Sequence, residues 1–212
     1  MKPIIFSTPM VQAILDGKKT QTRRVVKING YPITSPEESL ELTKEGLIYH
    51  SSYSMSGYYK PLCQPGDILW VRETWATVSC GIIEYKATYI DPYTGSTDID
   101  FIGKKITWRS PMFMPREEAR IFLKVTNVKV ERLQDISVQD AKNEGIRVHA
   151  NGCVDGLAFG CYNGDDCVYN RCKRPIEYFH ELWDSINAKR GYGWDANPWV
   201  WVIEFEREEV TL

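Results

Sequence analysis

Apolar and polar positions alternate along this chain in short runs, and these runs predict many strands and few helices. The longest run covers residues 121–130, where the pattern is that of a strand with one polar face. Residues 68–75 and 199–205 are rich in aromatic and β-branched side chains, as buried strands are. Residues 4–6, 20–26 and 85–90 predict three further strands.

A short amphipathic helix is expected at residues 8–15. Thr8 suits the N-cap, Pro9 suits the first helical position, and Gly17 suits the stop, because glycine tolerates the left-handed backbone there. The chain would leave this helix at Gly17 and enter the strand at residues 20–26.

Two more helices are expected in the second half of the chain. Ser137 followed by Asp140 has the form of a capping box, and Gly145 marks the end of that short helix. Residues 175–187 form an amphipathic pattern whose apolar side chains fall on one face. These are Ile176, Phe179, Leu182, Trp183 and Ile186.

Two segments lack this periodicity and are interpreted as insertions. Residues 28–65 are rich in Gly, Pro, Ser, Tyr and Glu, and residues 147–174 are rich in Gly, Asn and Cys. Many strands with few short helices favour an α+β fold built on a small β-barrel. We therefore expect residues 1–212 to form a single domain that carries both insertions.

Composition limits the function classes. The chain has 212 residues, is 43% apolar and has a net charge of -2, so its surface as a whole is not a nucleic-acid-binding field. No apolar run is long enough for a membrane span, and the N-terminus does not resemble a signal peptide. We expect a cytoplasmic protein without a membrane partner, whose cysteines are free or bound to metal.

The densest group of candidate functional side chains follows Gly17. Residues 18–24 contain four cations, two threonine hydroxyls and one amide. Guanidinium and ammonium groups can neutralise phosphate, and hydroxyls and amides can recognise a polar ligand. The alternative is a solvated basic strand.

This run is similar to a motif of the ASCH domain family, whose fold is a β-barrel related to the PUA RNA-binding module. The resemblance covers residues 17–24, 66–73, 125–145 and 199–205, or about two thirds of the chain when the intervening segments are counted. Residues 108–111 and 114–116, Trp-Arg-Ser-Pro and Met-Pro-Arg, resemble the long, prophage-associated branch.

The resemblance implies an amidohydrolase site made of Lys19, Thr22 and Glu144. Small ASCH proteins of this kind remove the acetyl group from N(4)-acetylcytidine, and no cofactor is required. A threonine hydroxyl needs a base to become a nucleophile, and a lysine among other cations can supply a neutral amine. In a regular strand, however, residues three apart point to opposite faces, so Lys19 and Thr22 converge only if the backbone turns between them.

The family likeness leaves two alternatives open, a non-catalytic RNA-binding module and an ASCH-type ribonuclease. In either case the ligand would be RNA or a nucleoside, held by cations and an aromatic ring. Plain structural roles, such as ion pairs for the arginines and core packing for the tryptophan, are the competing explanation. The candidate ligand-binding residues are Lys18, Arg23, Arg24, Arg72, Trp70 and Arg116.

Four cysteines fall within the second insertion, which has almost no apolar side chain to stabilise it. Four thiolates around one Zn²⁺ would supply that stability. The spacings of seven, five and four residues between them differ from those of common zinc ribbons, so free thiols are the alternative. The candidate ligands of this structural zinc are Cys153, Cys161, Cys167 and Cys172.

Overall fold

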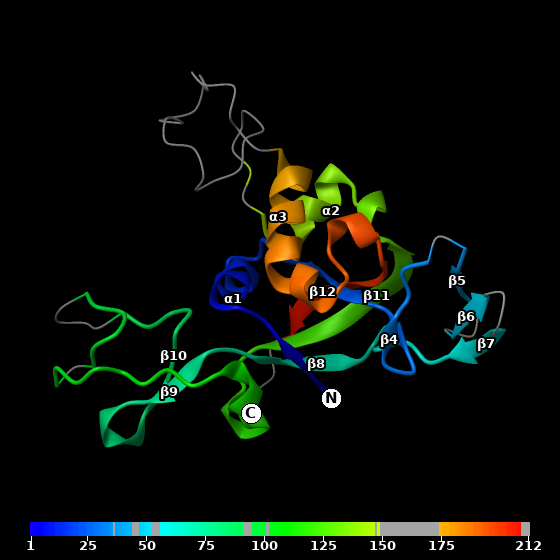
Figure 1. Ribbon diagram of the computed structural model, residues 1–212. Coiled ribbons are helices and arrows are strands. Elements are labelled where there is room, and N and C mark those ends of the chain that lie inside the picture. Colours follow the sequence, from blue (N-terminus) through cyan, green and yellow to red (C-terminus); the bar gives the residue numbers. More distant parts are fainter. Residues whose placement is uncertain are drawn as a thin grey trace, which may run out of the picture. The chain divides into compact units, whose positions relative to one another are not determined.

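The computed structural model describes residues 1–35, 37–43, 47–51, 56–90, 95–100, 102–146, 148 and 174–208 (Figure 1). The structure is a mixed α+β fold, with most strands in several sheets and few helices. Its contacts group into two compact units, which are described separately. The first contains residues 1–17, 66–125 and 206–212, and the second contains residues 18–65 and 126–205.

The sheet of the first unit has the strand order β1-β8-β11. β1 (Lys2–Ile5) is an edge strand and pairs in parallel with β8 (Ile68–Arg72), while β8 pairs antiparallel with the start of β11 (Phe122–Arg132). Helix α1 (Thr8–Leu15) follows β1 and buries Val11, Ala13 and Ile14.

A hairpin and several short helical turns complete the first unit. β9 (Trp75–Thr77) and β10 (Ile83–Tyr85) pair antiparallel across the 3-10 turn η1 (Ser79–Gly81). Two further 3-10 turns, η2 (Pro111–Phe113) and η3 (Arg116–Glu118), precede β11. The core of this part is made of Trp70, Trp75, Met114, Ala119 and Phe122.

The sheet of the second unit has the order β11-β12-β2, in which β12 (Trp199–Glu208) pairs antiparallel with the edge strand β2 (Gln21–Val25). Helices α2 (Val138–Asn143) and α3 (Pro175–Asn187) pack together beside β12 (Figure 1). The apolar side chains of this layer form one buried cluster. They include Leu133, Ile136, Ala141, Phe179, Trp183, Val200 and Val202.

The first predicted insertion carries regular structure of its own. β3 (Lys27–Ile28) pairs with β4 (Tyr31–Pro32), and β5 (Ser39–Leu42), β6 (Ile48–Ser51) and β7 (Ser56–Tyr59) form a three-stranded antiparallel sheet. The weak periodicity of residues 28–65 therefore did not reveal these five short strands.

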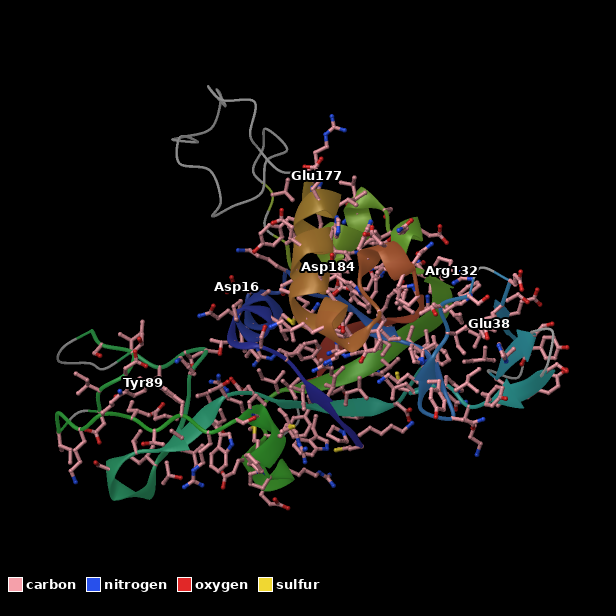
Figure 2. The ribbon with its side chains drawn as sticks, in the orientation of Figure 1. Asp16, Glu38, Tyr89, Arg132, Glu177 and Asp184 are labelled. Carbon is pink, nitrogen blue, oxygen red and sulfur yellow. The ribbon has the colours of Figure 1, made fainter. Side chains whose placement is uncertain are left out.

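Arg132 on β11 ties this insertion to the rest of the second unit. Its guanidinium donates to the carbonyl oxygens of Ser35 (2.6 Å) and Glu38 (3.1 Å) and lies over the Trp199 ring. Arg132 and Glu38 are labelled in Figure 2. The 3-10 turns η4 (Leu133–Asp135), η5 (Ala188–Arg190) and η6 (Trp194–Ala196) complete this unit.

Two expectations about strands are corrected. In the described part of the chain β1 and β2 are both sheet edges, and no strand pairing closes a barrel. The strand expected at residues 85–90 ends at Tyr85, because the amides of Thr88 and Tyr89 both turn back to donate to the Tyr85 carbonyl. The predicted helices agree with the observed ones, although Ser7 rather than Thr8 is the N-cap residue of α1.

Candidate functional site

Lys19 lies between α1 and β2, at a point where the chain changes direction. Gly17 has a φ of 69°, the left-handed conformation that suits glycine at the end of a helix. The Thr20 amide donates to the Asn143 carbonyl (2.9 Å), and the Thr20 carbonyl accepts from the Phe205 amide (2.9 Å). The backbone around Lys19 is thereby held between the end of α2 and strand β12.

Glu144 is positioned by both ends of the short helix α2. Ser137 and Asp140 form the predicted capping box, with the Ser137 hydroxyl accepting from the Asp140 amide at 3.1 Å. Glu144 is the C-cap, and Gly145 follows with a φ of 95°, so the helix stops there. Glu144 forms an isolated antiparallel bridge with Lys19.

The Lys19 ammonium is buried and all its described partners are oxygen atoms. Nζ lies 2.6 Å from Glu144 Oε2, 2.9 Å from the Glu144 carbonyl and 2.8 Å from the Gln21 carbonyl. Lys19 is 2% exposed and Glu144 is 7% exposed. Because the two side chains are buried and their charged atoms are only 2.6 Å apart, a proton can move between the amine and the carboxylate.

Arg23 contacts the same carboxylate. Its guanidinium lies near Glu144 Oε1 (3.3 Å), Glu131 Oε1 (2.6 Å) and Asp140 Oδ2 (3.5 Å), and its side chain is fully buried. These three carboxylates balance three cations, of which Lys19 precedes β2 and Arg23 and Arg24 lie on it. We call this group the Lys19–Glu144 cluster, and its members are Lys19, Arg23, Arg24, Glu131, Asp140 and Glu144.

Burial lowers the pKa of the Lys19 ammonium below its usual 10.5, and the charges of Arg24 and Arg23 lower it further. The attraction and hydrogen bond of Glu144 oppose this shift without cancelling it. The physical cause is that an ammonium removed from water loses its hydration, which disfavours the charged form. Lys19 can therefore release its proton more easily than an exposed lysine.

Thr22 and Arg24 lie on strand β2, which begins two residues after Lys19. Arg24 donates from one terminal nitrogen to the Thr22 hydroxyl oxygen (2.9 Å) and to the Arg23 carbonyl (3.1 Å). Burial lowers the pKa of Arg24, and the carboxylate of Glu144 raises it in part. The strand alternation puts Thr22 and Arg24 on one side of β2 and Arg23 on the other. Of the predicted catalytic residues, Lys19 and Glu144 are therefore hydrogen-bonded to each other. Thr22 is hydrogen-bonded to Arg24 instead.

Gln21 adds a buried amide to the same strand. The residue is 1% exposed, and neither its amide nitrogen nor its amide oxygen has a well-formed hydrogen bond within the described part of the chain. Burial would raise the pKa of the nearby Asp140 carboxyl, but the hydrogen bonds from Ser137, the charge of Arg23 and the Gln21 amide together lower it. The Gln21 amide is thus close to Asp140 but lacks hydrogen bonds of good geometry.

The remaining predicted ligand-binding residues are spread over both units. Lys18 is exposed in the second unit, whereas Arg72, Trp70 and Arg116 belong to the first. Trp70 is 6% exposed and packs in the core, with Arg72 against its ring, so it presents little surface for a base. Arg23, also predicted to bind the ligand, has its buried guanidinium among three carboxylates.

The predicted zinc ligands Cys153, Cys161, Cys167 and Cys172 lie outside the described residues. Within the described ranges, no group of three or more His, Cys, Asp or Glu side chains could hold a metal ion.

The contacts of Arg23 with Glu131 and Asp140 were not predicted from the sequence. The residues are more than 100 positions apart, so no local pattern connects them. One signal was present: Asp140 and Glu144 are four apart on a helix, which puts both carboxylates on the same face.

No protein-family model matches this chain, and comparison with curated proteins and with solved structures finds no similar protein. Among the helices that the structure describes, none is long and apolar enough to cross a membrane.

Proposed function

We propose that this chain is an ASCH-type, PUA-like hydrolase that removes an acetyl group from a modified nucleoside such as N(4)-acetylcytidine. The observation that carries the proposal is the buried contact of 2.6 Å between Lys19 Nζ and Glu144 Oε2, beside a lysine whose pKa is lowered by burial. These are the two groups that would accept and return a proton in such a reaction.

In the proposed first step, substrate binding brings the Thr22 hydroxyl to neutral Lys19, Lys19 takes its proton, and Thr22 Oγ1 forms a bond to the acetyl carbon. The carbonyl oxygen becomes an oxyanion. Arg24, which donates to Thr22 Oγ1 at 2.9 Å, would stabilise that negative charge.

In the second step, the bond between the acetyl carbon and the exocyclic nitrogen breaks. The proton passes from Lys19 through Glu144 to that nitrogen, which leaves as the amine of cytidine. Water then hydrolyses the threonine ester, giving acetate and restoring the Thr22 hydroxyl.

Lys19 and Thr22 are 2% and 1% exposed, so a substrate can reach them only after the side chains that cover them move. Side-chain and loop motions of this kind commonly accompany substrate binding. Exclusion of water would then strengthen the interactions between the charged groups in the closed state.

Acetate release from N(4)-acetylcytidine tests the proposal. Lys19→Ala and Glu144→Ala should each abolish release, and Thr22→Val should do so without removing a charge. Lys189→Ala is the control, because Lys189 is an exposed cation of the second unit that is not among the predicted site residues. Circular dichroism must show that each variant is folded.

Two outcomes would contradict the proposal. Turnover that survives in a folded Lys19→Ala protein would remove this mechanism. No turnover in the wild type, together with RNA binding that weakens as salt increases, would favour the binding module instead.

A further inference from the structure

The side chain of Gln21 has no part in the proposed reaction, although it lies among the residues that do. The Lys19 ammonium donates to the Gln21 carbonyl (2.8 Å), and Arg23 follows two positions later on the same strand. Strand alternation puts the side chains of Gln21 and Arg23 on the same side of β2, where Arg23 meets Glu144 and Asp140. The Gln21 amide therefore faces the Lys19–Glu144 cluster, close enough to Asp140 to lower the pKa of its carboxyl.

Both polar atoms of this amide are buried and lack a partner of good geometry. Gln21 is 1% exposed, and neither Nε2 nor Oε1 has a well-formed hydrogen bond to any residue that the structure describes. Arg23 Nε is a buried donor in the same condition. Folded proteins seldom leave buried polar atoms unsatisfied, because the hydrogen bonds that these atoms make with water in the unfolded chain are then lost. Three such atoms on one side of β2 indicate a small bound molecule that both donates and accepts.

Arg23 places this position between two carboxylates. One terminal nitrogen of its guanidinium lies 3.3 Å from Glu144 Oε1, and the other lies 3.5 Å from Asp140 Oδ2. Nε belongs to the same planar group, so a molecule bound to it lies beside a guanidinium that touches both carboxylates. The side chain of Asp140 is 18% exposed and that of Glu144 is 6% exposed. Asp140 is therefore the one of the two that is in better contact with solvent.

Water fits this position better than an ion does. The Gln21 amide supplies a donor and an acceptor, Arg23 Nε supplies a donor, and the carboxylate of Asp140 supplies an acceptor. A buried water typically makes about three hydrogen bonds, of both kinds, to groups such as these. An anion would meet the carboxylate of Asp140, and a cation would meet the guanidinium of Arg23, so either ion would be repelled.

We propose that the Gln21 amide and Arg23 Nε hold an internal water that carries protons between the buried Lys19–Glu144 pair and Asp140. A proton on Glu144 passes to the water, and the water passes one of its own protons to the carboxylate of Asp140. Asp140 then releases that proton to solvent, which restores the water and both carboxylates. The reverse sequence brings a proton in.

This role goes beyond the proposed hydrolysis and does not depend on it, because any proton transfer at a buried pair needs a route to solvent. Lys19 is 2% exposed and Glu144 is 7% exposed. Deacetylation is one reaction with this need. An amide and one water give a neutral amine, acetate and one proton, so a proton must leave the site in every turnover.

Exchange of the Lys19 ammonium protons with solvent tests the proposal, measured by NMR on the whole chain with 15N-labelled lysine. The signal is assigned by its loss in Lys19→Met. Gln21→Leu removes the amide and should slow exchange by about tenfold or more, because the water loses two hydrogen bonds. Asp140→Asn should also slow exchange, because an amide cannot take up the proton. Gln139→Leu is the matched control, since it makes the same change at an exposed position of α2, and it should leave the rate unchanged.

The direction of the change separates this role from a purely structural one. A variant that only loosens the packing opens the cluster to solvent more often, so its ammonium protons exchange faster. Loss of the proton route slows them instead. A nuclear Overhauser effect between water and the side-chain amide protons of Gln21 tests the bound water in the wild type, without any substitution.

Three results would overturn the proposal. They are exchange in Gln21→Leu or Asp140→Asn that is as fast as in the wild type or faster, equal slowing in Gln139→Leu, and no long-lived water beside Gln21 in the wild type. Acetate release judges the proposed hydrolysis separately, so the failure of one proposal is distinguished from the failure of the other.

Discussion

Arg23 has a fully buried charge. Its side chain has no exposed surface, and three carboxylates surround its guanidinium. Removing one partner of a buried ion pair leaves the others without compensation, which costs about 3–5 kcal/mol. Breaking an exposed ion pair of the same network lowers the free energy of unfolding far less, by about 0–1 kcal/mol.

Arg23→Ala should accordingly lower the free energy of unfolding by about 3–5 kcal/mol. Lys129→Ala is the matched control, since Lys129 also pairs with Glu131 (3.1 Å) but has 42% of its side chain exposed. Its removal should change the free energy by less than about 1 kcal/mol. Urea unfolding of both variants checks this, and similar decreases in the two would show that burial is not the deciding factor.

Lys19 should make stability depend on alkaline pH. Its pKa in the folded protein is lower than the 10.5 of a free lysine, so between those two values the unfolded chain binds more protons. The contribution of Lys19 to stability therefore rises with pH across that interval and is constant below it.

Comparing the wild type with Lys19→Met isolates this effect, because the variant has no amine to titrate. As pH increases toward 10.5, the wild type should gain stability relative to the variant in urea unfolding. A difference that stays constant across this range would show that the buried amine has an ordinary pKa.

At the scale of elements, α2 is the helix that brings its carboxylates to the cluster. Its capping box is the feature that the sequence predicted best, because Ser137 and Asp140 interact over three residues only. The pKa of Asp140 is lowered: burial would raise it, but the hydrogen bonds from Ser137 and the charge of Arg23 outweigh burial.

This shift predicts how Asp140→Asn behaves in acid. The stabilisation from the carboxylate is present above pH 3.8, the value of the unfolded state, and is lost as the pH falls through the lower folded value. The wild type should be more stable than Asp140→Asn at pH 7, and the gap should narrow below pH 3.8. Thermal melts at several acidic pH values measure this, and a gap independent of pH would contradict it.

How far elements could be predicted depends on their length and on the range of their contacts. Helix α3 has 13 residues with a clear apolar face, and strand β11 has 11 residues. Both are long enough for the periodicity of their apolar residues to predict the element. The sheet of β5, β6 and β7 has strands of only four residues, in which Leu40, Ile48 and His50 are the buried side chains. Such short alternation cannot be distinguished from a polar loop without its neighbours.

The candidate site was predictable in part. The residue types of the Lys19–Glu144 cluster came from a motif resemblance, but their geometry depends on contacts across more than 120 positions. Patterns within a short stretch of sequence cannot predict contacts between residues so far apart in the chain. The pairing of Thr22 with Arg24, two residues apart on one strand, could have been derived from strand alternation alone.

At the scale of the whole molecule, β11 and β12 each run through both compact units. The buried acid–base pair belongs to the second unit, while Arg72 and the Trp70 ring that it contacts belong to the first.

The account depends most on neutral Lys19 acting as a base beside Glu144. The direct test is the pH dependence of acetate release from N(4)-acetylcytidine, measured for the wild type and for Lys19→Arg. Arginine preserves the positive charge next to Glu144 but stays protonated, so it cannot accept the proton. We predict a wild-type rate that rises through a midpoint below 10.5 and no turnover in a folded Lys19→Arg protein. Equal rates in the two proteins, or no acetate from the wild type at any pH, would contradict the account.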